Sequence, residues 1–201
     1  MKKKAKAMTG KGRVKRKTKE TEIDITLKID GRGKYSIDTN EPFLTHMLEQ
    51  LSRHSGISMK IKAAGDVEID SHHLAEDTGI ALGMAVNEAL GDKKGIKRFG
   101  SAGILDEALV RVALDISGRP YADINMDLKV QRIGSFDTEL VEEFFKGFAS
   151  GAALTLHIDQ LKGKNTHHII EAAFKGLAVS LREAVAVCGD SAASTKGRIG
   201  K

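Results

Sequence analysis

The sequence predicts an α+β fold that is internally duplicated into two similar half-domains packed together. Three observations support this prediction. Short stretches alternate polar and apolar residues with a period of two, which is typical of half-buried strands. Longer segments between them place apolar residues at helical spacing. Finally, residues 43–91 can be laid over residues 140–186, so that a short helix, a strand and a long helix pair in each half.

The elements of the first half follow from local patterns. Residues 21–29 (TEIDITLKI) alternate polar and apolar side chains, and residues 31–33 (GRG) turn the chain after them. Pro42 suits the first turn of a helix, Ser71 is a favoured N-cap residue, and Gly91 is a typical helix stop. We therefore expect a strand at 21–29, a hairpin partner at 34–37, a helix at 40–51, a strand at 58–63 and a long helix from Ser71 to about Leu90.

The second half repeats this plan. We expect strands at 109–116 and 121–130, a helix at 138–149, a strand at 153–158 and a long helix from about Thr166. Both long helices open with the same signature, Ser-His-His-Leu-Ala-Glu at 71–76 and Thr-His-His-Ile-Ile-Glu at 166–171. No linker rich in Pro or Ser divides the chain, so we expect one compact unit with halves at about 19–95 and 96–187, followed by a C-terminal loop at 188–201.

The net charge of +5 comes from one end of the chain. Residues 1–18 hold nine Lys or Arg and no Asp or Glu, whereas the rest holds 23 basic and 27 acidic residues. We interpret residues 1–18 as a flexible basic tail that aids solubility. A nucleic-acid-binding protein that uses this tail is the alternative, but two Tyr, seven Phe and no Trp offer few side chains for base stacking.

Other features of composition indicate a cytoplasmic protein. The only cysteine, Cys188, excludes an internal disulfide and fits a reducing compartment. The basic N-terminal residues lack the apolar region of a secretory signal. No stretch approaches the roughly 20 apolar residues that a membrane span needs.

The repeated signature predicts metal binding. In each copy both histidines reach the glutamate at helical spacings of three or four residues, which share a face. Adjacent histidines point about 100° apart around a helix, so they suit two different ions. Imidazole and carboxylate donors favour Mn, Fe, Co, Ni or Zn. The alternative is that these are solvated polar residues at the starts of helices. Metal binding is favoured because the motif occurs twice and its two copies hold four of the seven histidines of the chain. The predicted ligands are His72, His73, Glu76, His167, His168 and Glu171.

Further ligands are expected on the short helices. His46 lies in the first short helix, and the repeat alignment pairs it with Glu143 in the second. Each half can therefore offer one ligand from its short helix and three from its long one. His54 is either a contact to a ligand or substrate or a surface histidine, and His157 is interpreted as a structural strand residue.

Several segments together resemble the imidazoleglycerol-phosphate dehydratase family. They cover nearly the whole chain after its basic start, and the doubled His-His-x-x-Glu makes the resemblance specific. The segments are RKTKET (16–21), PFLTHML (42–48), GDV (65–67), HHLAED (72–77), SGRPY (117–121), QRIG (131–134), HHIIEA (167–172) and STKG (194–197). Many family members carry His where this chain has Glu143.

The resemblance implies a lyase of histidine biosynthesis. Such enzymes dehydrate imidazole glycerol phosphate to imidazole acetol phosphate, usually with manganese, here two divalent ions per site. Their halves are each a sheet backed by helices. They assemble into symmetric homo-oligomers of about 24 copies, with active sites between subunits. A different dimetal enzyme, such as a hydrolase, could use the same ligands to activate water.

The resemblance also implies roles for single residues. The candidates for proton transfer are Glu20, Glu76 and Glu171. The family pattern points to Arg98, Arg119 and Lys196, with Ser194 and Thr195, as contacts to the substrate phosphate. Gln50 and Lys175 each lie one helical turn beyond a candidate ligand, and with Glu20 and His54 they are further candidates for substrate contact. A solvated surface residue is the alternative for each of them.

Overall fold

The computed structural model describes residues 10–200, so the part of the predicted tail at 1–9 lies outside the described residues. The first half comprises β1 (Lys11–Lys17), β2 (Thr21–Ile29), β3 (Tyr35–Thr39), α1 (Pro42–Ser55), β4 (Ile57–Gly65) and α2 (His72–Leu90). The second half comprises β5 (Phe99–Ser101), β6 (Ile104–Leu105), β7 (Ala108–Asp115), β8 (Tyr121–Asn125), β9 (Arg132–Ile133), β10 (Phe136–Asp137), α3 (Leu140–Ala152), β11 (Thr155–Lys162) and α4 (Thr166–Ala184).

The two halves share one topology, which confirms the predicted duplication. The first sheet has the order β1-β2-β4-β3, with β2 antiparallel and β3 parallel to β4. The second has the order β5-β7-β11-β8, with β7 antiparallel and β8 parallel to β11. Each parallel pair needs a crossover, which α1 supplies in the first half and α3 in the second. Thus α1 corresponds to α3, and α2 to α4.

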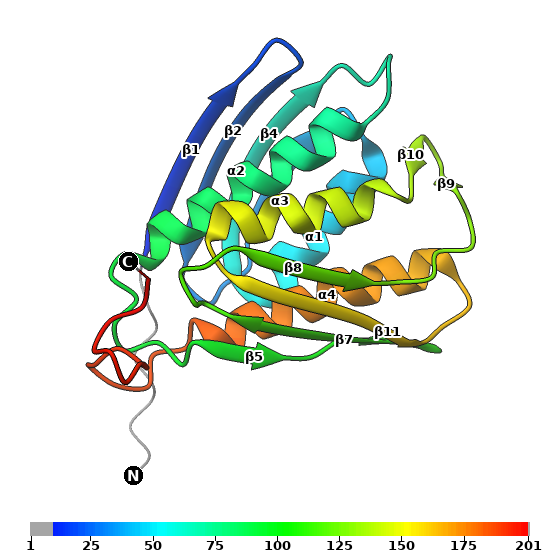
Figure 1. Cartoon of the computed structure of the whole chain (residues 1–201). Helices are drawn as coiled ribbons and strands as arrows, with labels where there is room; N and C mark the ends of the chain where they lie inside the picture. The colour runs from blue at the N-terminus through cyan, green and yellow to red at the C-terminus, as the bar shows by residue number, and fades with distance from the viewer. Residues whose placement is uncertain (1–9, 201) are drawn as a thin grey trace.

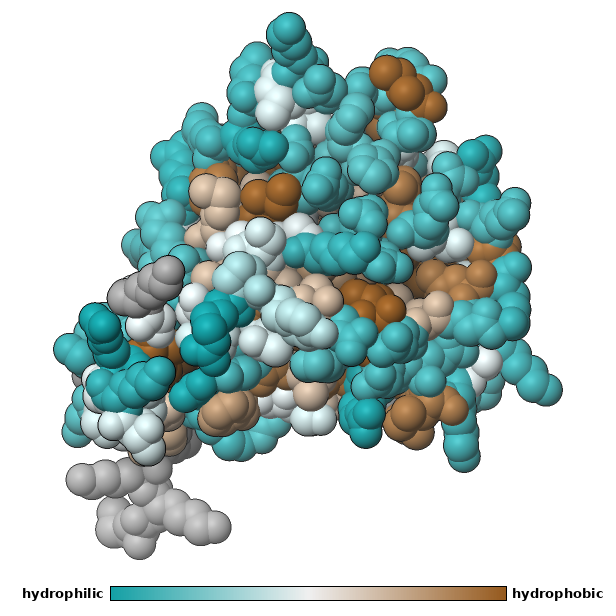
Figure 2. All heavy atoms as spheres, in the orientation of Figure 1, coloured by the Kyte–Doolittle hydropathy of each residue, from teal (hydrophilic) through white to brown (hydrophobic). Residues whose placement is uncertain are grey.

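The four helices lie between the two sheets (Figure 1). Helix α2 packs on β1 and β2, and α4 packs on β5 and β7. Across the halves, α2 contacts α3 and α1 contacts α4. Ile23, Ile25 and Leu27 are at most 1% exposed, and burying each such side chain contributes roughly 1.5–3 kcal/mol. The outer surface is mostly hydrophilic in the view of Figure 2, with hydrophobic patches between.

Glycines let α2 and α3 approach closely. A Cβ atom at Gly79 would lie 2.3 Å from the carbonyl oxygen of Phe144, and one at Gly83 would lie 2.3 Å from that of Phe148. On α3, Cβ atoms at Gly147 and Gly151 would lie 2.7 and 2.2 Å from backbone oxygens of α2. Real Cβ atoms do not come this near, so the helix pair depends on two glycines, four residues apart, on each side.

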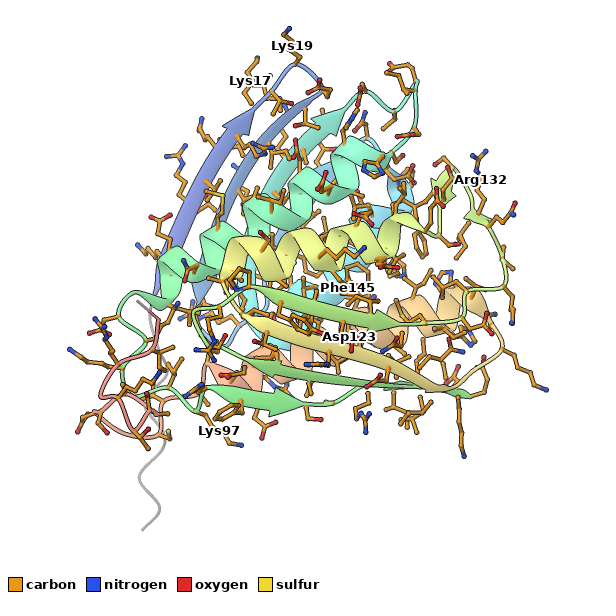
Figure 3. All side chains as sticks on the ribbon, viewed as in Figure 1. Lys17, Lys19, Lys97, Asp123, Arg132 and Phe145 are labelled. Atoms are coloured by element: carbon orange, nitrogen blue, oxygen red, sulfur yellow. The ribbon has the colours of Figure 1, made fainter. Side chains whose placement is uncertain are left out.

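The prediction of a flexible tail is wrong for residues 11–17, which form the edge strand β1. Its alternate residues turn toward α2, where Gly12 leaves room for the carbonyl of Ala85. The basic residues between them face solvent, and Lys15 and Lys17 pair with Asp24 and Glu22 of β2. Figure 3 shows Lys17 at the outer end of this hairpin. Most of the positive charge therefore lies on the outer side of a strand, whereas Arg16 turns inward and pairs with Asp77 of α2.

Other local predictions also need correction. The partner of β2 in a hairpin is β1, whereas β3 pairs with β4, because the crossover through α1 carries the chain past β2. Strand β8 ends at Asn125 instead of 130. Ser71 occupies the N-cap position of α2, but its hydroxyl donates to Glu41, and Asp70 accepts from the backbone N–H of His72 instead. Among the described residues, no helix is long and apolar enough to cross a membrane.

Candidate metal centre

One group of three potential ligands comes together where the halves meet. His46 of α1 lies beside His167 and Glu171 of α4, with donor atoms all within 4.8 Å of one another. Glu171 Oε2 lies 3.3 Å from His167 Nε2 and 3.8 Å from His46 Nε2. Within the described part of the chain, this is the only such group of three.

The start of α4 sets this geometry. The side chain of Asn165 accepts from the backbone N–H groups of His167 and His168, so the helix begins at Thr166. His167 and Glu171 are then one turn apart on the face that packs against α1. The ring of Phe43 meets the His167 ring edge-on at 5.3 Å.

Lys175 prepares the Glu171 carboxylate for a cation. Its ammonium lies 2.7 Å from Oε1, which leaves Oε2 facing the two histidines. Burial raises the pKa of Glu171, but the hydrogen bond and charge of Lys175 outweigh it, so the pKa is lowered overall. Two imidazoles and one ionised carboxylate, gathered around one point, fit a divalent ion of the Mn to Zn series.

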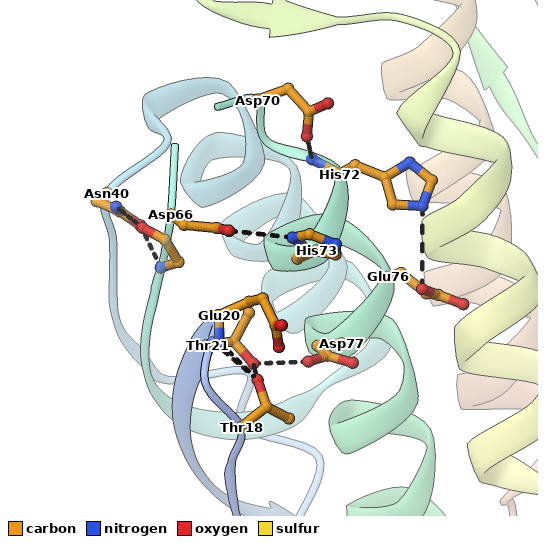
Figure 4. A network of polar contacts seen from close by, with 11 residues as sticks. Thr18, Glu20, Thr21, Asn40, Asp66, Asp70, His72, His73, Glu76 and Asp77 are labelled. Carbon is orange, nitrogen blue, oxygen red and sulfur yellow. Dashed lines mark hydrogen bonds and ion pairs between the residues drawn. The ribbon is translucent and has the colours of Figure 1, made fainter. Parts of the chain in front are cut away.

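The counterpart on α2 and α3 is more open. His72 Nε2 lies 4.0 Å from Glu76 Oε2, which repeats the pair on α4 (Figure 4). Glu143, which occupies the place of His46 in the repeat, lies 3.2 Å from Lys146 Nζ instead. These three residues are therefore related by the duplication without forming a compact group.

The second histidine of each motif points elsewhere, as predicted. The ring planes of His72 and His73 differ by 87°, and those of His167 and His168 by 88°. His73 Nδ1 lies 3.2 Å from Asp66, which raises the pKa of His73 (Figure 4).

His168 Nδ1 lies 2.7 Å from Oε2 of Glu107. This hydrogen bond raises the pKa of His168 and, with backbone donors, lowers that of Glu107 to about 2. The sequence analysis missed Glu107. Its only signal is position, because it directly precedes β7 as Glu20 directly precedes β2.

Three predicted substrate contacts lie along the same α1–α4 seam. His54 Nε2 is 3.1 Å from the side-chain oxygen of Gln50, one turn beyond His46. Burial lowers the pKa of His54, and the charge of Lys175 adds to this effect. Glu20 lies apart from them, at the β1–β2 turn (Figure 4). Its backbone carbonyl accepts a hydrogen bond from the N–H of Asp66.

The predicted phosphate-binding residues share a pocket of about 490 Å³. Arg98 is held there by two hydrogen bonds to Asp115, which raise its pKa, and it donates to the carbonyl of Ala193. Arg198 also lines the pocket and was missed, although it follows the predicted Lys196 by two residues. The full lining is Arg98, Ser117, Arg119, Ala193, Ser194, Thr195, Lys196, Arg198, Ile199 and Gly200.

Within one chain this pocket is far from the three-ligand group. The backbone N–H of Arg98 donates to the carbonyl of Ala184 at the end of α4, whereas His167 stands at its beginning. A helix of 19 residues is about 28 Å long, so the two sites lie at opposite ends of α4. One small substrate cannot reach both sites in the same chain.

The comparisons with known proteins agree on one family. A model of the imidazoleglycerol-phosphate dehydratase family matches residues 39–181. The imidazoleglycerol-phosphate dehydratase of Ruegeria sp. is 55% identical over 190 residues, which cover 92% of this chain and 97% of that protein. The enzyme of Cereibacter sphaeroides is 51% identical over 193 residues, covering 94% of this chain and 99% of that protein.

Solved structures of this family show the same fold. The crystal structure of imidazoleglycerol-phosphate dehydratase from Staphylococcus aureus has a TM-score of 0.80 and 42% identity, and covers 88% of this chain and 99% of that chain. The structure from Pyrococcus furiosus has a TM-score of 0.81 and 41% identity, and covers 92% of this chain and 100% of that chain.

Proposed function

The chain belongs to the imidazoleglycerol-phosphate dehydratase family, and we propose that it dehydrates imidazole glycerol phosphate with two divalent metal ions bound between neighbouring copies. The product is imidazole acetol phosphate, and the step belongs to histidine biosynthesis. The observation that carries the metal proposal is the group of His46, His167 and Glu171, whose donor atoms lie within 4.8 Å of one another.

The proposed ligands divide into an inward set, which serves ions at the chain's own two ligand groups, and an outward set, His73 and His168, which serves ions in neighbouring copies. His46, His167 and Glu171 serve one ion, and their repeat counterparts Glu143, His72 and Glu76 serve the other. His73 and His168 diverge from these sets, with Nδ1 already bonded to Asp66 and Glu107. Since Nε2 is then left for an ion outside the chain's own group, each of these histidines completes the coordination in a neighbouring copy. Nitrogen and oxygen donors together suit manganese.

The separation of the two sites supports assembly. The phosphate pocket and the group of three ligands lie toward opposite ends of α4, roughly 20–26 Å apart along its axis. A site that uses both must take them from different copies of the chain. A contact between unlike surfaces recurs from copy to copy and ends only where the assembly closes. We propose a closed homo-oligomer, and the family resemblance implies about 24 copies.

The reaction removes the hydroxyl next to the imidazole ring and a hydrogen from the neighbouring carbon, and the resulting enol becomes the ketone. That hydrogen is not acidic, because no carbonyl stands beside it. When bound, the divalent ions supply Lewis acidity that favours the anionic form of the substrate imidazole.

The chain's own residues hold the substrate and move the protons. Arg119, Lys196 and Arg198, with Ser194 and Thr195, supply cations and hydroxyls for the phosphate. Gln50, His54 and Lys175 line the seam beside the ligands and contact the glycerol part. Glu171, ionised beside Lys175, is one candidate acceptor for the proton, and Glu20 and Glu76 are the others.

The test combines turnover with metal content. The purified protein should convert imidazole glycerol phosphate and leave simple phosphate esters intact, which separates it from a dimetal hydrolase. His167→Ala and Glu171→Gln should lose turnover and bound metal, as measured by elemental analysis. His157→Ala on β11 is the matched control and should keep both. Full metal and full turnover in the His167 and Glu171 variants would refute the ligand assignment.

A further inference from the structure

Glu107 uses both oxygens of its carboxylate at the start of α4. It lies in the turn between β6 and β7, 61 positions before His168. Oε1 accepts from the backbone N–H groups of Lys164 and Asn165, at 3.4 and 3.1 Å. Oε2 accepts from His168 Nδ1 at 2.7 Å. A side chain from a distant turn is thus bonded to both the backbone and a side chain of the metal-binding motif.

These bonds close into a ring around the helix start. Glu107 holds the N–H of Asn165, and the side chain of Asn165 accepts from the N–H groups of His167 and His168. His168 returns to Glu107 through its ring. Each member fixes the next, so groups of the protein itself orient the imidazole.

The ring also determines which nitrogen of His168 carries the proton. An ionised carboxylate only accepts hydrogen bonds, so Nδ1 must be the donor. The lone pair of the neutral ring is then on Nε2, and no described residue hydrogen-bonds to that atom. A metal ion needs this lone pair, so the bond to Glu107 selects the tautomer that can bind one.

In the first half a carboxylate also lies at Nδ1 of the second histidine of the motif, but a different segment supplies it. His73 Nδ1 faces Asp66, which lies after β4. The position that corresponds to Glu107 holds Glu20, whose side chain has no bond to a histidine among the described residues. In each half, therefore, one carboxylate is bonded to Nδ1 of the outward histidine, although a different segment supplies it. This repetition indicates that the bond between carboxylate and histidine has the same role in both halves.

We propose that Glu107 is a positioning residue that orients His168 and fixes its tautomer for a metal ion shared with a neighbouring copy. The proposal rests on the proposed role of His168 as a ligand. In the alternative, Glu107 only holds the β6–β7 turn against the backbone of Lys164 and Asn165. Its substitution would then lower the stability of the fold and leave the affinity for metal unchanged.

Glu107→Gln separates these roles because an amide has one acceptor and one donor group. If its oxygen holds the backbone N–H groups, its NH2 group faces Nδ1 and favours the tautomer with the proton on Nε2, which cannot bind an ion. We expect manganese affinity, measured by competition with a chelator in the assembled protein, to fall roughly 10–100-fold. Glu68→Gln is the control, because Glu68 is an exposed loop glutamate with no side-chain bond in the described chain, and it should match the parent protein.

A double-mutant cycle with His168→Ala makes the outcome decisive. If Glu107 acts through His168, Glu107→Gln should weaken metal binding in the parent chain and have no further effect in the His168→Ala chain. Glu107→Ala provides a second variant, and thermal unfolding reports whether each variant folds. A lower melting temperature with unchanged metal affinity, or equal weakening in both backgrounds, would overturn the proposal. If His168→Ala itself leaves metal affinity unchanged, the ligand assignment fails instead.

Discussion

Replacing Gly147 of α3 by alanine tests how the helix packing supports the site. The new Cβ would lie 2.7 Å from the carbonyl oxygen of Glu76, whereas an ordinary contact begins at 3.4 Å. The obstacle is backbone, which cannot rotate away, so the turn of α2 that carries Glu76 must retreat by about 0.7 Å. That turn lies opposite the turn of α3 that precedes Gly147 and carries Glu143.

The size of the effect follows from two opposing contributions. Overpacking a tight contact costs about 1–3 kcal/mol. Alanine in turn stabilises the helix by up to about 1 kcal/mol relative to glycine, because of its higher helix propensity. We therefore expect a net loss of up to about 2 kcal/mol, which lowers the melting temperature by up to roughly 8 °C for a chain of this size. Misplacing a catalytic group by about 1 Å can cost about 100-fold in rate, so turnover should fall more than stability does.

Two other variants make the assay specific. Gly151→Ala meets the backbone of Ile80 at 2.2 Å, one turn further from Glu143, and should lower stability with a smaller loss of turnover. Gly189→Ala meets nothing within 4 Å and should match the parent chain. Calorimetry at equal protein concentration and steady-state kinetics give both readouts. A Gly147→Ala protein with unchanged melting temperature and turnover would refute the close approach of α2 and α3.

Three further predictions concern charge and assembly. The pKa of Glu107 is lowered from 4.5 to about 2, chiefly by His168, so this carboxylate stabilises the fold above pH 4.5 and the contribution is lost as pH falls toward 2. Stability measured across that range should decline less steeply in Glu107→Gln. Arg119→Ala removes a charge-assisted contact that contributes about 1.5–3 kcal/mol, so KM should rise about 10–100-fold and inhibition by inorganic phosphate should weaken; an unchanged KM would count against the pocket. A chelator should reduce the particle mass in light scattering, and manganese should restore it, because ions bound only between copies favour assembly by mass action; constant mass after metal removal would argue for protein contacts alone.

Local patterns predicted the elements whose buried faces are regular. In β2 every second residue is buried, and the alternation was visible in the sequence. β1 was not predicted, because its inward positions are Gly12, Val14 and Arg16, so apolar residues do not alternate with polar ones along it. The pairing of β3 with β4 could not be predicted either, because it depends on how the crossover through α1 returns.

The candidate ligands were predictable, but their grouping was not. The repeated signature and the alignment of His46 with Glu143 identified the residue types from sequence. Which of them meet depends on the packing of α1 against α4, which unites His46 with His167 and Glu171 across the halves. Glu107 and Arg198 belong to no recognisable motif. Glu107 contacts His168, which is far away in the chain, and Arg198 lines a pocket with Arg98 and Arg119, so both contacts depend on the folded structure.

The number of metal ions per chain tests the central proposal most directly. The protein would be stripped with a chelator and reloaded with manganese in steps, with elemental analysis and turnover of imidazole glycerol phosphate measured at each step. Two ions per site, with one group of ligands from each half of the repeat, predict full activity only as the ratio approaches two ions per chain. Full turnover at one ion per chain, or in the metal-free protein, would contradict it.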